Sequence, residues 1–177
     1  ELDNAFINSL QDGRGNIYAD NINAVSGVFR YAPYGLSSKI KFSVTVPSGT
    51  PGAATVTFTE KVYDELNGFT ASSNYFRIPF RAKYQLSVFV DWEPYSGEYR
   101  SHSLYVLNRG NVVEVGGREH STEAEPLVTS GSEEASLPQG SFITVVCSIP
   151  NLGVSLDCTG SLTVRLIRTH DGADGFS

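Results

Sequence analysis

Apolar and polar side chains alternate with a period of two along most of this 177-residue chain. In the clearest stretch, residues 82–92, every second side chain is apolar: Tyr84, Leu86, Val88 and Val90. A period of two places such side chains on one face of a β-strand. That face must be buried against a second layer, so the pattern predicts a sandwich or a barrel.

Similar stretches recur along the chain with no helical pattern between them. We expect strands over residues 39–46, 54–63, 68–79, 103–115, 135–149 and 160–168, with a turn at Asn108-Arg109-Gly110 inside the fourth. Charged residues make up 18% of the chain, below the usual quarter, and aromatic residues 11%. Both values favour an all-β fold.

Charge and hydropathy restrict the partners of the chain. The formal net charge is −6 and the pI is near 5.0, whereas binding through phosphates needs clustered Lys and Arg. No apolar run approaches the roughly 18 residues that span a bilayer. We therefore expect neither nucleic-acid binding nor membrane insertion.

The N-terminal segment differs from the rest. Leu2, Phe6 and Leu10 recur at helical spacing, and weakly alternating residues follow them. Such a segment cannot bury a core alone, so we expect residues 1–35 to form a stalk that winds with identical copies. A partly disordered leader is the alternative. Residues 36–170 would form the head and 171–177 a tail.

Eight residues in the middle of the chain have the spacing of a known signature. They are Phe58, Asp64, Phe69, Phe76, Pro79, Tyr84, Leu86 and Val88. Their intervals resemble the signature of the C1q-type globular head, although Ala82, Leu86 and Val88 replace a Gly, a Phe and an aromatic residue there. The likeness continues through SLPQGSFITV and CTGSLTVRLI, and it covers about residues 36–169.

The resemblance to the C1q/tumour-necrosis-factor family implies a ten-stranded jelly roll that associates as a homotrimer, with both termini at its base. Alternate connections would then face the apex, near residues 47–53, 109–126 and 150–158. The connection at 92–102 would lie toward the base or the flank.

Two groups of residues are candidates for receptor binding. The first is a connection rich in aromatic rings, which are common binding anchors: Trp92, Tyr95 and Tyr99. The second is polar and would be apical: Arg109, Asn111, Asn151 and Asp157. Two alternatives stay open, namely that Trp92 caps its strand or packs between protomers, and that the polar group is merely solvated.

No motif for catalysis stands out in the sequence. His102, His120 and His170 are expected in loops or the tail, with Glu119-His120 in a solvated loop, and no nucleophile, zinc or phosphate-loop pattern occurs. We expect a non-enzymatic protein without a cofactor or metal.

Acidic residues and cysteines leave two questions open. Glu133-Glu134 and the pair Asp171 and Asp174 offer oxygen ligands for calcium, but no dense Asp/Asn/Gly ladder accompanies them. Cys147 and Cys158 are compatible with a disulfide and equally with two buried thiols.

A short segment favours one biological setting. GNIYADNI, residues 15–22, resembles stretches that precede distal domains in phage central tail fibres. This predicts a fibre tip on the virion surface that attaches to a host cell-surface protein or glycan. The alternative is a secreted, extracellular C1q-like or cytokine-like trimer of an animal, and an enzyme is less favoured than either.

Overall fold

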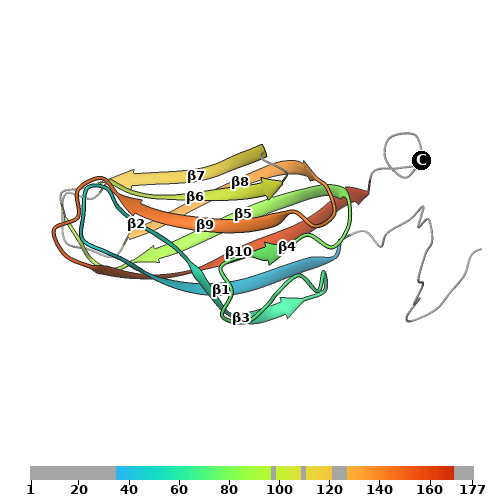
Figure 1. Ribbon diagram of the computed structural model, residues 1–177, viewed down its shortest axis with the longest axis horizontal. Coiled ribbons are helices and arrows are strands. Elements are labelled where there is room, and N and C mark those ends of the chain that lie inside the picture. The colour runs from blue at the N-terminus through green and yellow to red at the C-terminus, as the bar shows by residue number, and fades with distance from the viewer. Residues whose placement is uncertain (1–34, 97–98, 109–110, 121–126, 170–177) are drawn as a thin grey trace, which may run out of the picture.

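The computed structural model describes residues 35–96, 99–108, 111–120 and 127–169, and these residues form two antiparallel β-sheets (Figure 1). The predicted stalk and tail lie outside the described residues, apart from Gly35. In chain order the strands are β1 (Ser37–Val46), β2 (Gly52–Thr55), β3 (Thr57–Asp64), β4 (Phe76–Arg77), β5 (Ala82–Trp92), β6 (Tyr99–Asn108), β7 (Asn111–His120), β8 (Leu127–Leu137), β9 (Phe142–Ile149) and β10 (Leu156–Thr169). The prediction of an all-β fold is confirmed.

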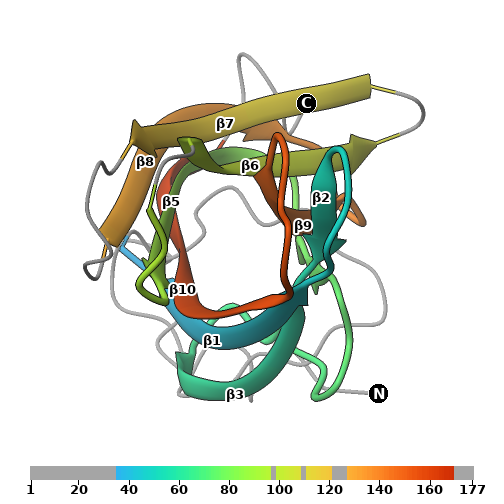
Figure 2. The same cartoon turned by 90° about the vertical axis from the view of Figure 1, so that its left-hand side faces the viewer.

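The two sheets enclose one core between them (Figure 2). The first sheet has the strand order β3-β1-β10-β5-β8, and the second has the order β2-β9-β6-β7 with β4 also paired to β9. The edges of the two sheets meet where β7 and β8 lie side by side.

Strand pairing defines two ends of the sandwich. Ser37 pairs with Arg165 near the proximal end, where the described chain begins and finishes, and Trp92 pairs with Cys158 at the opposite, distal end. The connections 46–52, 92–99 and 149–156 therefore all lie at the distal end, on the left of Figure 1.

The signature residues serve the core and one turn. Phe58, Phe76, Tyr84, Leu86 and Val88 are buried, and Phe69 packs against the core from a half-buried position. Pro79 is also half-buried.

Asp64 fastens the turn that follows β3. Its Oδ1 accepts hydrogen bonds from the Ser38 hydroxyl at 2.6 Å and from the Gly68 N–H at 3.2 Å. Its Oδ2 accepts the Phe69 N–H at 3.1 Å. A carboxylate at this position thus joins the turn to β1.

Some predicted strand bounds are wrong. The stretch 54–63 is two strands in different sheets, because the chain crosses from the second sheet to the first at buried Val56. Only Phe76–Arg77 is a strand within 68–79, and 135–149 is broken by a turn at Pro138–Ser141. β8 begins at Leu127, well before the predicted strand.

The distal connection is also shorter than predicted. β5 continues to Trp92 and β6 begins at Tyr99, so His102 lies in a strand and not in a loop. β7 likewise extends through Glu119 to His120, which corrects the prediction of a solvated loop there. His170 lies outside the described residues.

Candidate functional site

The distal end brings together residues from both groups of receptor-binding candidates. The aromatic connection 92–99 was expected at the base or flank, and this is wrong, because β5 ends distally. It lies at the same end as the connection 149–156, which carries Asn151. The two alternatives for the binding surface therefore share one end of the molecule.

The three aromatic candidates differ in exposure. Tyr99 is 45% exposed, whereas Tyr95 is half-buried and packs against the core. Trp92 is 1% exposed, so its ring is interior and is not presented to solvent, which corrects the expectation of an exposed ring. Its part in receptor binding stays a prediction. Its position at the end of β5 fits the alternative that it caps the strand.

Hydrogen bonds tie the distal connections to one another. Asp157 accepts the Thr45 hydroxyl at 2.5 Å, and its backbone N–H donates to the Glu93 carboxylate at 2.8 Å. Asn151 accepts the Thr50 hydroxyl at 3.3 Å. Asn151 and Asp157 are both exposed, so this end presents a polar surface beside Tyr99.

Asn111, a third polar candidate, does not belong to this end. Asn111 pairs with Asn108 in the β6–β7 hairpin, and that hairpin turns at the proximal end because Leu107 pairs with Phe142. Its predicted apical position is therefore wrong. Arg109 lies outside the described residues.

A polar layer lies inside the sandwich beneath the distal surface. We call Trp92, Arg100, His102 and Thr129 the distal polar layer; all four are buried. Trp92 Nε1 donates to Thr129 Oγ1 at 2.8 Å, and His102 Nδ1 lies 2.7 Å from the same oxygen. Burial lowers the pKa of His102 to about 4, so its ring is neutral at pH 7.

Arg100 is the most unusual member of this layer. Its side chain is fully buried, and its Nη1 donates one long hydrogen bond of 3.4 Å to the carbonyl oxygen of Glu93. Desolvation lowers its pKa, which nearby Cys158 and Tyr95 oppose. Sequence reasoning missed Arg100 and His102, although they share the alternating phase of buried Leu104.

Cys147 and Cys158 are free thiols, both buried, on β9 of the second sheet and β10 of the first. Of the two alternatives left open by the sequence, the structure has the buried thiols. Burial raises the pKa of both, that of Cys158 to about 12. Such thiols are poor nucleophiles and poor metal ligands.

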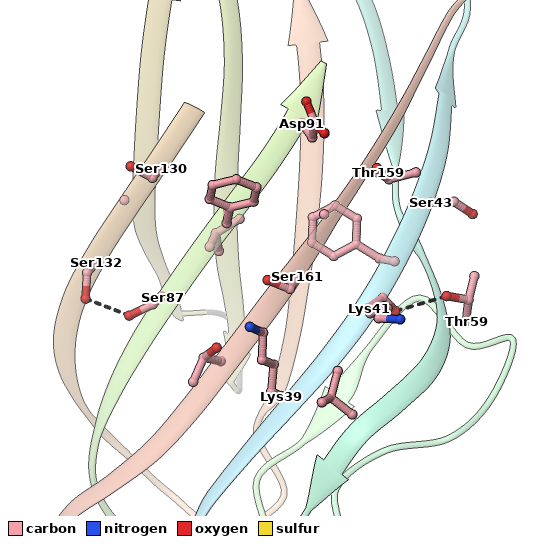
Figure 3. A pocket seen from close by; sticks show the side chains of 17 residues that line it. Lys39, Lys41, Ser43, Thr59, Ser87, Asp91, Ser130, Ser132, Thr159 and Ser161 are labelled. Carbon is pink, nitrogen blue, oxygen red and sulfur yellow. Dashed lines mark hydrogen bonds between the residues drawn. The ribbon is translucent and has the colours of Figure 1, made fainter. Parts of the chain in front are cut away.

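A second feature is a hollow of about 1100 Å³ on the outer face of the first sheet (Figure 3). Eight hydroxyl side chains line it: Ser43, Thr59, Ser87, Ser130, Ser132, Thr159, Ser161 and Thr163. Lys39, Lys41 and Asp91 are its charged residues, and Lys41 also pairs with Glu60. Its lining offers many hydrogen bonds but no His or Cys.

No three His, Cys, Asp or Glu residues within the described ranges gather to hold a metal ion. Among the same residues, no helix has the length and apolarity to cross a bilayer. Glu133 and Glu134 lie on β8, while Asp171 and Asp174 lie outside the described residues.

Comparison with known proteins identifies the fold. No protein-family model matches the chain, and no curated protein is similar in sequence. The globular domain of zebrafish complement 1qA is similar in structure, with a TM-score of 0.59 at 17% identity over 75% of this chain and 98% of that one. Murine APRIL is similar with a TM-score of 0.54 at 17% identity, over 74% of this chain and 100% of that one. The chain therefore has the C1q/TNF-like jelly-roll fold, as predicted.

Proposed function

We propose that this chain is a non-enzymatic receptor-binding head that acts as a homotrimer at the tip of a phage fibre, on the virion surface. The observation that carries the proposal is the outer face of the first sheet, which combines a concave surface with exposed apolar side chains. The second part of the proposal is that the distal end attaches to the host.

The outer face of the first sheet suits self-association. Phe89 and Val128, on neighbouring strands, are 46% and 43% exposed, and Val62 on the far side of the hollow is 51% exposed. Exposed apolar residues grouped on one face favour burial by a partner. Hydroxyls between them can exchange water for hydrogen bonds to that partner.

A concave face and a convex partner surface are different surfaces, so a contact between copies would be heterologous. Contacts of this type close into rings when the rotation between copies allows it. A ring of three places three distal ends side by side. Three modest binding sites then act together, and avidity raises the attachment strength by orders of magnitude.

Sedimentation velocity tests the assembly. We expect the wild type to sediment as a trimer and Phe89→Glu to sediment as a monomer, because the substitution places a charge in the contact. Val154→Glu is the matched control, since Val154 is also exposed (55%) but lies in a distal connection. A monomeric wild type, or a trimeric Phe89→Glu variant, contradicts this contact.

Cell binding tests the attachment role. We expect Tyr99→Ala to weaken binding of labelled protein to host bacteria about tenfold or more, since aromatic anchors carry much of an interface's energy. Tyr75→Ala is the matched control, because Tyr75 is 40% exposed near the proximal end. Equal effects of the two substitutions would remove the distal end from the proposal.

A secreted, C1q-like or cytokine-like animal trimer is the second candidate, and the similar animal structures favour it. Binding to animal cells but not to bacteria supports this candidate. The coding sequence upstream of Glu1 discriminates independently, because phage tail modules and Gly-x-y repeats are readily told apart.

A further inference from the structure

The hollow on the outer face of the first sheet has a charge pattern that limits which surface can fill it. Lys39 and Lys41 lie on the proximal side of Asp91 within the hollow (Figure 3). Lys41 is paired with Glu60, whereas Lys39 is half-buried and forms no ion pair with any described residue. The proximal side of the hollow therefore favours an acidic partner.

Closure into a ring limits the partner surface further. Contact surfaces on opposite sides of a molecule add copies in an open row, whereas a ring needs two surfaces that meet at an angle. The outer face of the second sheet lies opposite the hollow, so it is excluded (Figure 2). Two edges of the sandwich remain: the edge where β7 and β8 lie side by side, and the edge that ends in β3.

The β3 edge does not complement Lys39. Lys61 is exposed on this edge and pairs with Ile40, the neighbour of Lys39, so a contact there would bring like charges together. The carboxylates of this edge, Glu60 and Glu65, already bind groups of their own chain. The β3 edge is therefore the poorer partner for the hollow.

The β8 edge carries the complementary charge. Glu133 has the inward phase of buried Thr129 and Ala135 but is exposed, because β8 is the outermost strand of the first sheet. Glu134 pairs with Lys83 of its own chain, whereas Glu133 forms no ion pair with a described residue. This edge therefore offers a carboxylate to another molecule.

Strand register places the two charges at nearly the same height in the sandwich. Successive register steps across the first sheet lead from Lys39 to the residue next to Glu133, and they run through Thr163, Ser87 and Ser132. Rotation about an axis parallel to the strands, which sets three distal ends side by side, leaves the height of each residue unchanged. Glu133 of one copy therefore meets Lys39 of the next to within about one residue, or about 3.4 Å.

We infer that the β7–β8 edge of one copy fills the hollow of the next copy, and that Glu133 pairs with Lys39 across this contact. The inference rests on the proposed self-association and names its second surface. Ser87, Ser161 and Thr163 line the hollow close to Lys39, and their hydroxyls can donate hydrogen bonds to the incoming carboxylate.

Charge reversal followed by sedimentation velocity tests the pair. We expect Lys39→Glu and Glu133→Lys each to raise the concentration at which half of the chains are trimeric about tenfold or more, because like charges then meet. The double variant restores opposite charges and should return to within about threefold of the wild type. Arg77→Glu is the matched control, since it reverses an exposed charge on β4 of the second sheet and should leave the trimer unchanged.

Cross-linking tests the same contact in the wild type. A carbodiimide joins a carboxylate directly to an amine that touches it, so mass spectrometry of the digested trimer should find Glu133 linked to Lys39. Within one chain the two residues are three strand spacings apart, about 14 Å, which is too far for such a link. A trimer mixed from isotope-labelled and unlabelled chains should therefore show the link between a labelled and an unlabelled peptide.

The outcomes separate this contact from the self-association itself. A monomeric wild type overturns the proposed assembly and this contact with it. A trimeric wild type without the link between Glu133 and Lys39 overturns this contact alone, because the hollow then receives another surface. A double variant that is no more trimeric than the single variants does the same.

Discussion

Gly160 shows how one missing side chain shapes the core. It pairs with Phe42 across β10 and β1, and its inward side lies under the Phe42 ring. A Cβ added at Gly160 would overlap that ring and the carbonyl oxygen of Phe89. We therefore expect Gly160→Ala to lower the free energy of unfolding by about 1–3 kcal/mol, because overpacking displaces both neighbours.

Chemical denaturation measures this loss, and Gly153→Ala is the matched control. A Cβ at Gly153 would meet no heavy atom within 4 Å, so the same chemical change is free of overlap there. If both variants unfold at the same denaturant concentration, the close packing of Phe42 on Gly160 does not contribute as described.

At the scale of the strand, β6 makes stability depend on pH. Its inward His102 has a pKa of about 4, below the ordinary 6.5, because the buried ring is desolvated. As pH falls below 6.5, His102 therefore binds a proton in the unfolded chain. In the folded chain it binds that proton only near pH 4. We expect the free energy of unfolding to fall by about 3 kcal/mol across this window as pH decreases.

Denaturant titrations at several pH values between 7.5 and 4 check this dependence. The comparison is with His102→Gln, which keeps hydrogen-bonding capacity but does not titrate. The contributions of His120 and His170 are present in both proteins and cancel in the difference. A wild type and a variant with parallel pH profiles would assign the dependence to other groups.

Strands were predictable where the buried side is apolar and the chain stays in one sheet. The bounds of β5 agree with the sequence prediction because its inward residues are apolar from Ala82 to Trp92. The sequence did not predict the division between β2 and β3, because the alternation continues through it. Gly52, Val56 and Phe58 all face inward. When the chain passes from one sheet to the other, the two-residue alternation continues unchanged, so the sequence pattern does not reveal the crossing.

The starts of β6 and β8 were not predicted, because polar residues occupy inward positions there. β8 carries Thr129, Gly131 and Glu133 in the phase of its buried Ala135, so its alternation is weak. β6 begins with inward Arg100 and His102. The distal polar layer was hidden for the same reason, since its partners, such as Thr129, come from strands that only tertiary structure brings together.

At the scale of the whole molecule, the sandwich is divided along its length. Its proximal part buries aromatic and aliphatic residues such as Phe76 and Tyr84, while its distal part buries the polar layer and both thiols. The signature residues lie mostly in the first part and thus predicted the fold. The candidate site lies over the second part. The sequence placed the connections 47–53 and 150–158 at this end correctly, and it misplaced the connection 92–102.

The thiols report on separation of the two sheets, because Cys147 and Cys158 belong to opposite sheets and both face the core. Their raised pKa values, about 12 for Cys158, leave almost no thiolate at pH 7.5. We expect both to resist a thiol reagent in the native protein and to react only as fast as the whole domain unfolds. Ser48→Cys, in an exposed distal connection, provides a thiol that should react at once. Rapid native labelling of Cys147 or Cys158 would mean that the distal core opens locally, whereas labelling that follows the unfolding midpoint means that the two sheets separate as one cooperative unit.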